Sequence, residues 1–115
     1  MNEKFHNVVF KFVDGNLKGT IDDVRHYAGR FFVVGQLAVS YSKVIAFYDK
    51  RSGRFYTTTE RFSSETSKHE NAVREVILER VEPSRVVVVT NIRKGVEECG
   101  IDGFDTLNGE CFYIK

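Results

Sequence analysis

The chain has 115 residues, of which 42% are hydrophobic and 29% are charged, and these proportions are typical of one globular domain. Its formal net charge is +1, so the overall charge does not indicate a polyanionic partner. No apolar run approaches the ~20 residues that cross a bilayer, and the first residues carry no signal-peptide pattern. We therefore expect a cytoplasmic protein that does not enter a membrane.

Cysteine usage and residue bias bear on the cellular setting. Cys99 and Cys111 lie outside any CxxC motif, so in a cytoplasmic protein we expect free thiols, and the sequence leaves their redox state open. Gln36, Met1 and Pro83 are each the only residue of their type, whereas charged residues are plentiful. This bias is a trend of heat-adapted proteins and suggests a thermophilic source, and a virus-infected host is the other setting that we consider.

The N-terminal third predicts a strand, a short helix and a second strand. Residues 7–13 (NVVFKFV) alternate as a strand does and are followed by a turn-forming Asp-Gly-Asn. Residues 21–28 follow a threonine that can cap a helix and carry apolar residues on one face, which predicts a short helix. Residues 31–41 (FFVVGQLAVSY) favour a buried strand with a bulge at Gly35.

The middle of the chain predicts a hairpin and a long helix. Residues 43–49 (KVIAFYD) and 54–60 (RFYTTTE) flank a polar loop that ends in glycine, which is typical of a β-hairpin. Ser67 and Glu70 then fit a capping box, and apolar residues at helical spacing predict a helix over 68–81.

The C-terminal third predicts two strands around a short helix. The valines of residues 86–89 form a continuous β-branched run, which is typical of a central strand covered on both faces. Asn91 fits the cap of a short helix that ends at Gly100, and residues 111–114 (CFYI) predict a final strand.

The predicted order β-α-β-β-β-α-β-α-β determines the fold class that we expect. Strand–helix–strand units need crossover connections and a partly parallel sheet, whereas the hairpin adds antiparallel strands. We therefore expect a single α/β domain over residues 1–115. Its mixed sheet would have an antiparallel hairpin portion and helices packed on its faces, in the manner of a ribonuclease-H-like fold.

Two pairs of segments carry a family resemblance. FKFVDGN (10–16) precedes YAGRFFVV (27–34), and ENAVREVILERV (70–81) precedes RVVVVTNIRKGVEECGI (85–101). The first pair resembles the first strand, loop and turn of the dinitrogenase iron–molybdenum cofactor accessory family, and the second pair is similar to that family's helix, strand and short helix. The resemblance implies a ribonuclease-H-like domain, and no binding residue is carried over from it.

Three acidic residues are candidates for a catalytic metal site. Asp14 and Asp49 each end a predicted strand, and Glu70 begins the main predicted helix. Phosphodiester hydrolysis needs several carboxylates around Mg²⁺, and the predicted element order allows them to converge. The structural alternative is that Asp14 and Asp49 are turn residues and Glu70 is a helix cap. The three histidines are scattered without the spacing of a zinc site, so we expect no metal site of that kind.

Four basic residues surround the predicted hairpin. Lys50, Arg51, Arg54 and Arg61 are interleaved with phenylalanine and tyrosine. Arginine binds phosphate and aromatic rings stack on bases, so the hairpin is a candidate surface for single-stranded nucleic acid. The alternative is a solvated, charged hairpin over an aromatic core.

The sequence contains no P-loop, GxGxxG or GxSxG motif. Our leading hypothesis is a non-enzymatic binding domain without a cofactor, which forms a homodimer and acts on a partner, such as another protein, that the sequence does not identify. Two alternatives stay open: nucleic-acid binding through the basic hairpin, and a Mg²⁺-dependent nuclease of ribonuclease-H-like type.

Overall fold

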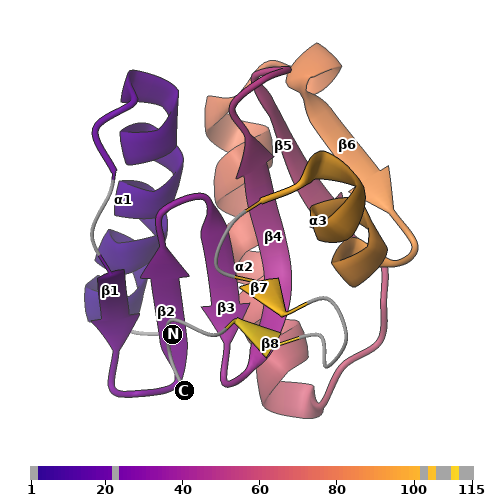
Figure 1. The fold of residues 1–115 in the computed structure, drawn as a ribbon. Helices are drawn as coiled ribbons and strands as arrows, with labels where there is room; N and C mark the ends of the chain where they lie inside the picture. Colours follow the sequence, from indigo (N-terminus) through magenta and orange to yellow (C-terminus); the bar gives the residue numbers. More distant parts are fainter. Residues whose placement is uncertain (1–2, 22–23, 102–103, 106–109, 112–115) are drawn as a thin grey trace.

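The computed structural model describes residues 3–21, 24–101, 104–105 and 110–111, which form three α-helices, a six-stranded sheet and a two-stranded sheet (Figure 1). The elements in chain order are α1 (Glu3–Lys18), β1 (Val24–Tyr27), β2 (Phe31–Val34), β3 (Leu37–Ser40), β4 (Lys43–Asp49), β5 (Arg54–Thr58), α2 (Ser64–Arg80), a 3₁₀ turn (Pro83–Arg85), β6 (Val86–Val89), α3 (Ile92–Cys99), β7 (Phe104–Asp105) and β8 (Glu110–Cys111). None of the described helices is long and apolar enough to cross a membrane.

The main sheet is mixed, as the sequence predicts. Its strands lie in chain order from β1 to β6, and neighbouring strands from β1 to β5 are antiparallel. After β5 the chain crosses over through α2 and returns as β6, which is parallel to β5 with Phe55 opposite Val86. The α/β class, the hairpin β4–β5 and the parallel crossover are therefore confirmed.

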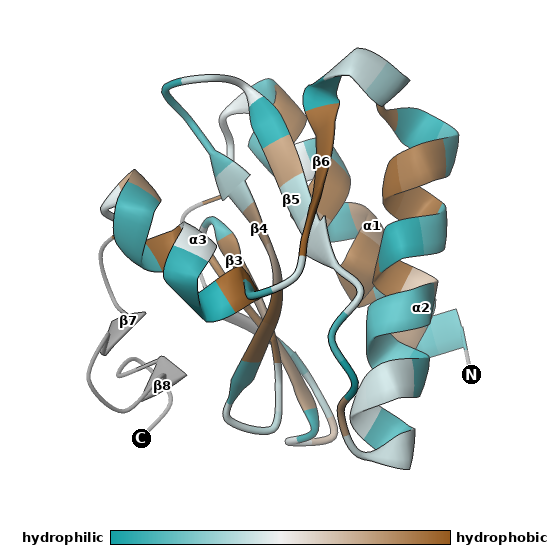
Figure 2. Cartoon of the chain, turned by 90° about the vertical axis from the view of Figure 1, so that its right-hand side faces the viewer, coloured by the Kyte–Doolittle hydropathy of each residue, from teal (hydrophilic) through white to brown (hydrophobic). Residues whose placement is uncertain are grey.

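Helices cover both faces of this sheet. Figure 2 shows α1 and α2 on one side and α3 on the other. One apolar core lies between the sheet and α1 and α2, with Phe12, Phe55 and Ile77 fully buried, and the other lies under α3 around Phe47 and Val96. Burial of this apolar surface is the main favourable contribution to folding. All of β3 and every residue of β4 after its first are buried, so these two strands form the centre of the sheet.

The predicted first strand is wrong, because residues 7–13 lie inside α1. Its buried residues recur every three to four positions and form one helical face: Phe5, Val8, Val9, Phe12, Val13 and Asn16. The segment 10–16, which resembles the first strand of the dinitrogenase cofactor accessory family, is also helical, and the helix continues through Gly15. Packing of this face against the sheet outweighs the local β propensity of the valines and phenylalanines.

The predicted helix over 21–28 is also wrong, since β1 occupies much of that range, and residues 22–23 lie outside the described part of the chain. Ala28 and Gly29 have φ values of 48° and 69°, and the N–H of Arg30 donates to the carbonyl of Tyr27 at 2.9 Å. Two successive residues with positive φ form the turn that suits a β-hairpin. The glycine interpreted as a helix stop is therefore part of the β1–β2 turn.

The predicted strand over 31–41 is two strands. Gly35, with a φ of 57°, begins a two-residue turn, and Val34 is paired with Leu37 across it. The expected bulge at Gly35 is thus a hairpin turn, which only a residue tolerant of positive φ allows.

Helix α2 begins earlier than predicted. Its cap is Ser63, whose hydroxyl accepts a hydrogen bond from the N–H of Thr66 at 3.4 Å. Ser67 lies within the helix, so the predicted capping box is wrong. For α3 the prediction is confirmed: the Asn91 side chain accepts from the N–H of Lys94, and Gly100 ends the helix in the left-handed region.

The valine strand is wrongly predicted to be central. β6 is the last strand of the main sheet among the described residues, and Val88 is 54% exposed. Two short strands, β7 and β8, pair at the C-terminal end, and residues 112–114 of the predicted final strand lie outside the described residues. The observed order, with a helix first and five strands before α2, differs from the order that suggested a ribonuclease-H-like fold.

Candidate functional site

The strands of the sheet alternate in direction, so their turns gather at two opposite ends of the molecule. At the lower end in Figure 1 lie the β1–β2 and β3–β4 turns and the start of α2. The β4–β5 hairpin loop lies at the upper end. The parallel pair β5–β6 runs away from that loop, and ligands commonly bind at the carboxyl ends of the strands in open α/β sheets.

A cavity of about 460 Å³ lies at the carboxyl ends of β5 and β6. Three cationic side chains line it, and each comes from a different segment. Lys43 is the first residue of β4, Arg61 follows β5, and Arg93 is the second residue of α3. We call this the first cavity. Its volume is within the ~300–1,000 Å³ range of small-ligand sites.

The N-termini of two helices face this cavity. Ser63, the cap of α2, and Asn91, the cap of α3, are both lining residues. Each strand of the parallel pair leads directly into its helix, and this connection brings the two N-termini to one edge of the sheet. Unpaired N–H groups and the helix dipole give such an N-terminus a partial positive charge, which attracts anions. The first cavity is therefore electropositive through its helices as well as through its side chains.

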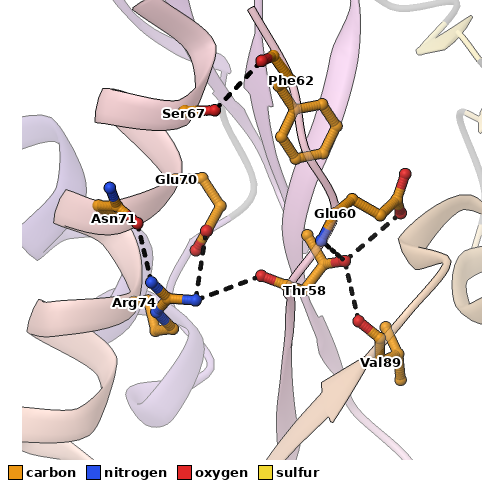
Figure 3. Close-up of polar contacts among 8 residues, drawn as sticks. All are labelled: Thr58, Glu60, Phe62, Ser67, Glu70, Asn71, Arg74 and Val89. Carbon is orange, nitrogen blue, oxygen red and sulfur yellow. Dashed lines mark hydrogen bonds and ion pairs between the residues drawn. The ribbon is translucent and has the colours of Figure 1, made fainter. Parts of the chain in front are cut away.

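A carboxylate of the chain already occupies the N-terminus of α3. Oε1 of Glu60 accepts a hydrogen bond from the N–H of Ile92 at 2.5 Å (the side chains around Glu60 are drawn in Figure 3). The Thr58 hydroxyl donates to the carbonyl of Val89 at 2.9 Å and accepts from the N–H of Glu60 at 3.0 Å, which ties the ends of β5 and β6 together. The position of Glu60 shows that this edge of the cavity accommodates an anionic oxygen.

Helix α2 is held to the end of β5 by Arg74, which also pairs with Glu70 of the same helix. Arg74 lies 3.4 Å from Oε1 of Glu70, and it donates to the Thr58 carbonyl at 3.4 Å and to the Asn71 side chain at 2.8 Å (Figure 3). Glu70 is only 5% exposed, and burial raises the pKa of its carboxyl group while Arg74 opposes that shift. Glu70 and Arg74 therefore position the residues that border the first cavity.

The three acidic candidates occupy separate places. Asp14 lies on α1 and binds Arg80 at 2.6 Å, and Asp49 accepts hydrogen bonds from Ser52 and from the N–H of Arg51 in the hairpin loop. Glu70 is paired with Arg74 on α2. In the part of the chain that the structure describes, no group of three or more His, Cys, Asp or Glu side chains could hold a metal ion.

The four basic candidates do not form one surface. Lys50, Arg51 and Arg54 surround the β4–β5 loop, whereas Arg61 lies beyond the far end of β5, in the first cavity. The guanidinium of Arg51 donates to the carbonyl of Cys99 at the C-terminal end of α3. Arg51 thus fastens the hairpin loop to α3, where the helix dipole favours a cation.

Sequence reasoning missed Lys43, Asn91 and Arg93 as members of a site. Lys43 and Arg93 are 50 positions apart in the sequence, and they line the same cavity only because α3 packs against β4. One signal could have found Asn91: it is a helix cap directly after a parallel strand, which is the arrangement of many phosphate sites.

Cys99 is placed as the sequence suggests, near the end of α3. Burial raises the pKa of its thiol, and the nearby carboxylate of Asp49 raises it further. A thiol that is held protonated is a poor nucleophile, so Cys99 is a packing residue beside Tyr56.

No protein-family model matches this chain, and no curated protein or solved structure is detectably similar to it.

Proposed function

We propose that this protein is a non-enzymatic binding domain for a phosphate-bearing ligand, and that the first cavity takes a nucleotide phosphate. Lys43, Arg61 and Arg93 converge on one cavity at the N-terminus of α2, and this observation carries the proposal. Guanidinium groups bind phosphate oxygens in pairs of hydrogen bonds, and lysine adds a compact point charge.

The chemistry of the lining favours an anion over a neutral ligand. Three cationic side chains outnumber the one carboxylate, Glu60, and that carboxylate already accepts a hydrogen bond from the N–H of Ile92. Phe62 also lines the cavity and offers an apolar surface to a base or sugar. A phosphate group on an organic body therefore fits the lining better than a bare inorganic ion.

The test is binding of thymidine 5′-monophosphate at low salt, measured by isothermal titration calorimetry. We expect Arg61→Gln combined with Arg93→Gln to weaken binding at least about tenfold, because each lost charged hydrogen bond contributes about 1.5–3 kcal/mol. The matched control is Lys50→Gln combined with Arg54→Gln, which removes the same charge at the opposite end of the molecule.

Three results would decide against this site. Wild-type protein that binds no nucleotide at millimolar concentration would end the proposal, and so would unchanged binding by the Arg61, Arg93 variant. Loss of binding in the Lys50, Arg54 variant alone would instead support the hairpin surface that the sequence predicts. Circular dichroism of each variant shows whether the fold is retained.

Other expectations stay predictions. These are the homodimer, a cytoplasmic location, a thermophilic or viral source, a ribonuclease-H-like fold and kinship with the dinitrogenase cofactor accessory family. A Mg²⁺-dependent nuclease is not the function we propose, because Asp14, Asp49 and Glu70 each bind a different neighbouring side chain.

A further inference from the structure

A second cavity, of about 490 Å³, lies on the other side of the first turn of α2. It is lined by Tyr27, Arg30, Ser64, Glu65, Lys68 and His69, which belong to the β1–β2 hairpin and to the start of α2. Both of these segments lie at the lower end of the molecule in Figure 1.

The first turn of α2 forms the ridge between the two cavities. Ser63 and Thr66 line the first cavity, whereas Ser64 and Lys68 line the second. Successive helical residues are rotated by about 100°, so these pairs project from opposite sides of the helix. The β3–β4 turn continues the ridge, because Lys43 lines the first cavity and the Tyr41 hydroxyl donates to Glu65 of the second at 2.6 Å. The first turn of α2 and the β3–β4 turn thus separate the two cavities.

A buried chain of hydrogen bonds joins the walls of the two cavities. The Ser40 hydroxyl contacts Thr66 Oγ1 at 3.1 Å and Nδ1 of His69 at 2.7 Å, and all three side chains are buried. Thr66 lines the first cavity and His69 lines the second. This shared, rigid wall fixes the spacing between them.

His69 offers the second cavity a polar group that nothing else uses. The ring is 2% exposed, and Nδ1 bonds to Ser40. Among the described residues, Ser40 is the only hydrogen-bond partner of this ring, which leaves Nε2 for a ligand in the cavity that His69 lines.

The lining of the second cavity carries one more cation than anion. Arg30 and Lys68 are exposed cations on different segments. The carboxylate of Glu65 is already engaged, since it accepts from Tyr41 and lies 3.5 Å from Arg30. These contacts hold the pKa of Glu65 below its ordinary value, the Tyr41 hydrogen bond being the largest cause.

We propose that Arg30 and Lys68, which line the second cavity beside His69, form a second phosphate subsite, and that the ligand is a single-stranded nucleic acid whose backbone crosses the first turn of α2. This inference rests on the proposed function of the first cavity. Two cationic hollows on either side of one ridge suit a chain that carries a phosphate on every unit, and a mononucleotide fills only one of them. Tyr41, 42% exposed beside the second cavity, adds an aromatic face on which a base can stack.

Ligand length separates this inference from the proposed function. Fluorescence anisotropy would compare thymidine 5′-monophosphate, as a competitor, with a labelled oligothymidylate of about 12 nucleotides. We expect Arg30→Gln combined with Lys68→Gln to weaken oligonucleotide binding about tenfold and to leave mononucleotide binding unchanged. The slope of log affinity against log salt should fall by about one to two, because about one phosphate contact is lost with each cation.

A second readout reports on His69 itself. In ¹⁵N–¹H spectra of the histidine side chains, the oligonucleotide should shift Nε2 of His69, and the mononucleotide should not. The Lys50→Gln, Arg54→Gln variant controls for the loss of two charges elsewhere and should bind both ligands as the wild type does.

The outcomes are distinguishable. If the mononucleotide binds but the oligonucleotide binds no more tightly, or if the Arg30, Lys68 variant weakens neither ligand or both equally, the second subsite is wrong and the first stands. If neither ligand binds, the proposed function fails and this inference fails with it.

Discussion

His69 is a buried histidine whose ring is hydrogen-bonded and lies near charged side chains. Its ring stacks on Phe5 at 5.1 Å between centroids and packs beside Phe31, while Nδ1 bonds to Ser40. Burial lowers the pKa of the imidazole; Glu65 opposes this shift and Arg30 adds to it. The folded protein therefore favours the neutral ring.

This burial predicts a pH-dependent stability. In the unfolded chain a histidine binds a proton near pH 6.5, whereas the folded protein binds one at His69 only at lower pH. As pH falls through that window, the unfolded state binds more protons and the free energy of unfolding decreases. We expect His69→Asn to flatten this decrease in urea denaturation between about pH 7.5 and pH 5.5.

Two comparisons sharpen that measurement. The raised pKa of Glu70 acts in the opposite direction, since protonation of its buried carboxyl favours the folded state, so only the difference between wild type and variant isolates His69. His26→Asn controls for the loss of an exposed imidazole. An undiminished slope in His69→Asn would contradict the assignment.

Tyr41, whose ring lies beside that of His69, has a strained backbone conformation. Its φ of 57° is unusual for a residue with a side chain, and such a conformation costs of order 1 kcal/mol. The hydroxyl bond to Glu65 and the ring contact with His69 hold it there. The strained turn therefore keeps Tyr41 over the ridge between the two cavities.

At the scale of elements, α1 is the largest difference from the sequence-based prediction. Gly15 lies in this helix although glycine disfavours helices by about 1 kcal/mol relative to alanine. After Gly19 the chain reverses, and a Cβ atom on Gly15 would lie 2.7 Å from Cβ of Ile21. Gly15 is therefore required for the close approach of Ile21 to the helix.

This contact predicts that Gly15→Ala destabilises the protein. Overpacking costs about 1–3 kcal/mol, which exceeds the ~1 kcal/mol that alanine gains in helix propensity, so we expect a net loss of about 1 kcal/mol in urea denaturation. The control is Lys11→Ala on the exposed side of α1, where little change is expected. A more stable Gly15→Ala variant would show that Ile21 does not pack as described.

At the scale of the whole molecule, β6 forms one edge of the sheet among the described residues. β6 is its last described strand, Val88 is 54% exposed, and an unpaired apolar edge can pair with another strand. The homodimer predicted from the sequence would form most simply by β6 pairing with β6 of a second copy.

Native mass spectrometry tests this association. We expect a dimer for the wild type and a monomer for Val88→Lys, because a lysine on an edge strand opposes pairing. Leu78→Lys is a matched control, since Leu78 is 53% exposed on α2, and it should remain a dimer. A monomeric wild type, or a dimeric Val88→Lys variant, would rule out pairing through β6.

Local patterns in the sequence were sufficient for the β4–β5 hairpin, the body of α2, the capped helix α3 and the parallel crossover. Each depends on interactions within a few residues, such as the Asn91 cap, or on a periodicity that one segment carries alone. The local patterns also included Arg61 among the candidate binding residues.

Only the tertiary structure decided the identity of α1, the central position of β4 and the members of the two cavities. Residues 7–13 suit a strand locally, and their helical face becomes favourable only when it is buried against the sheet. Lys43, Arg61 and Arg93 meet through strand pairing and helix packing between distant segments, and no local pattern contains that information.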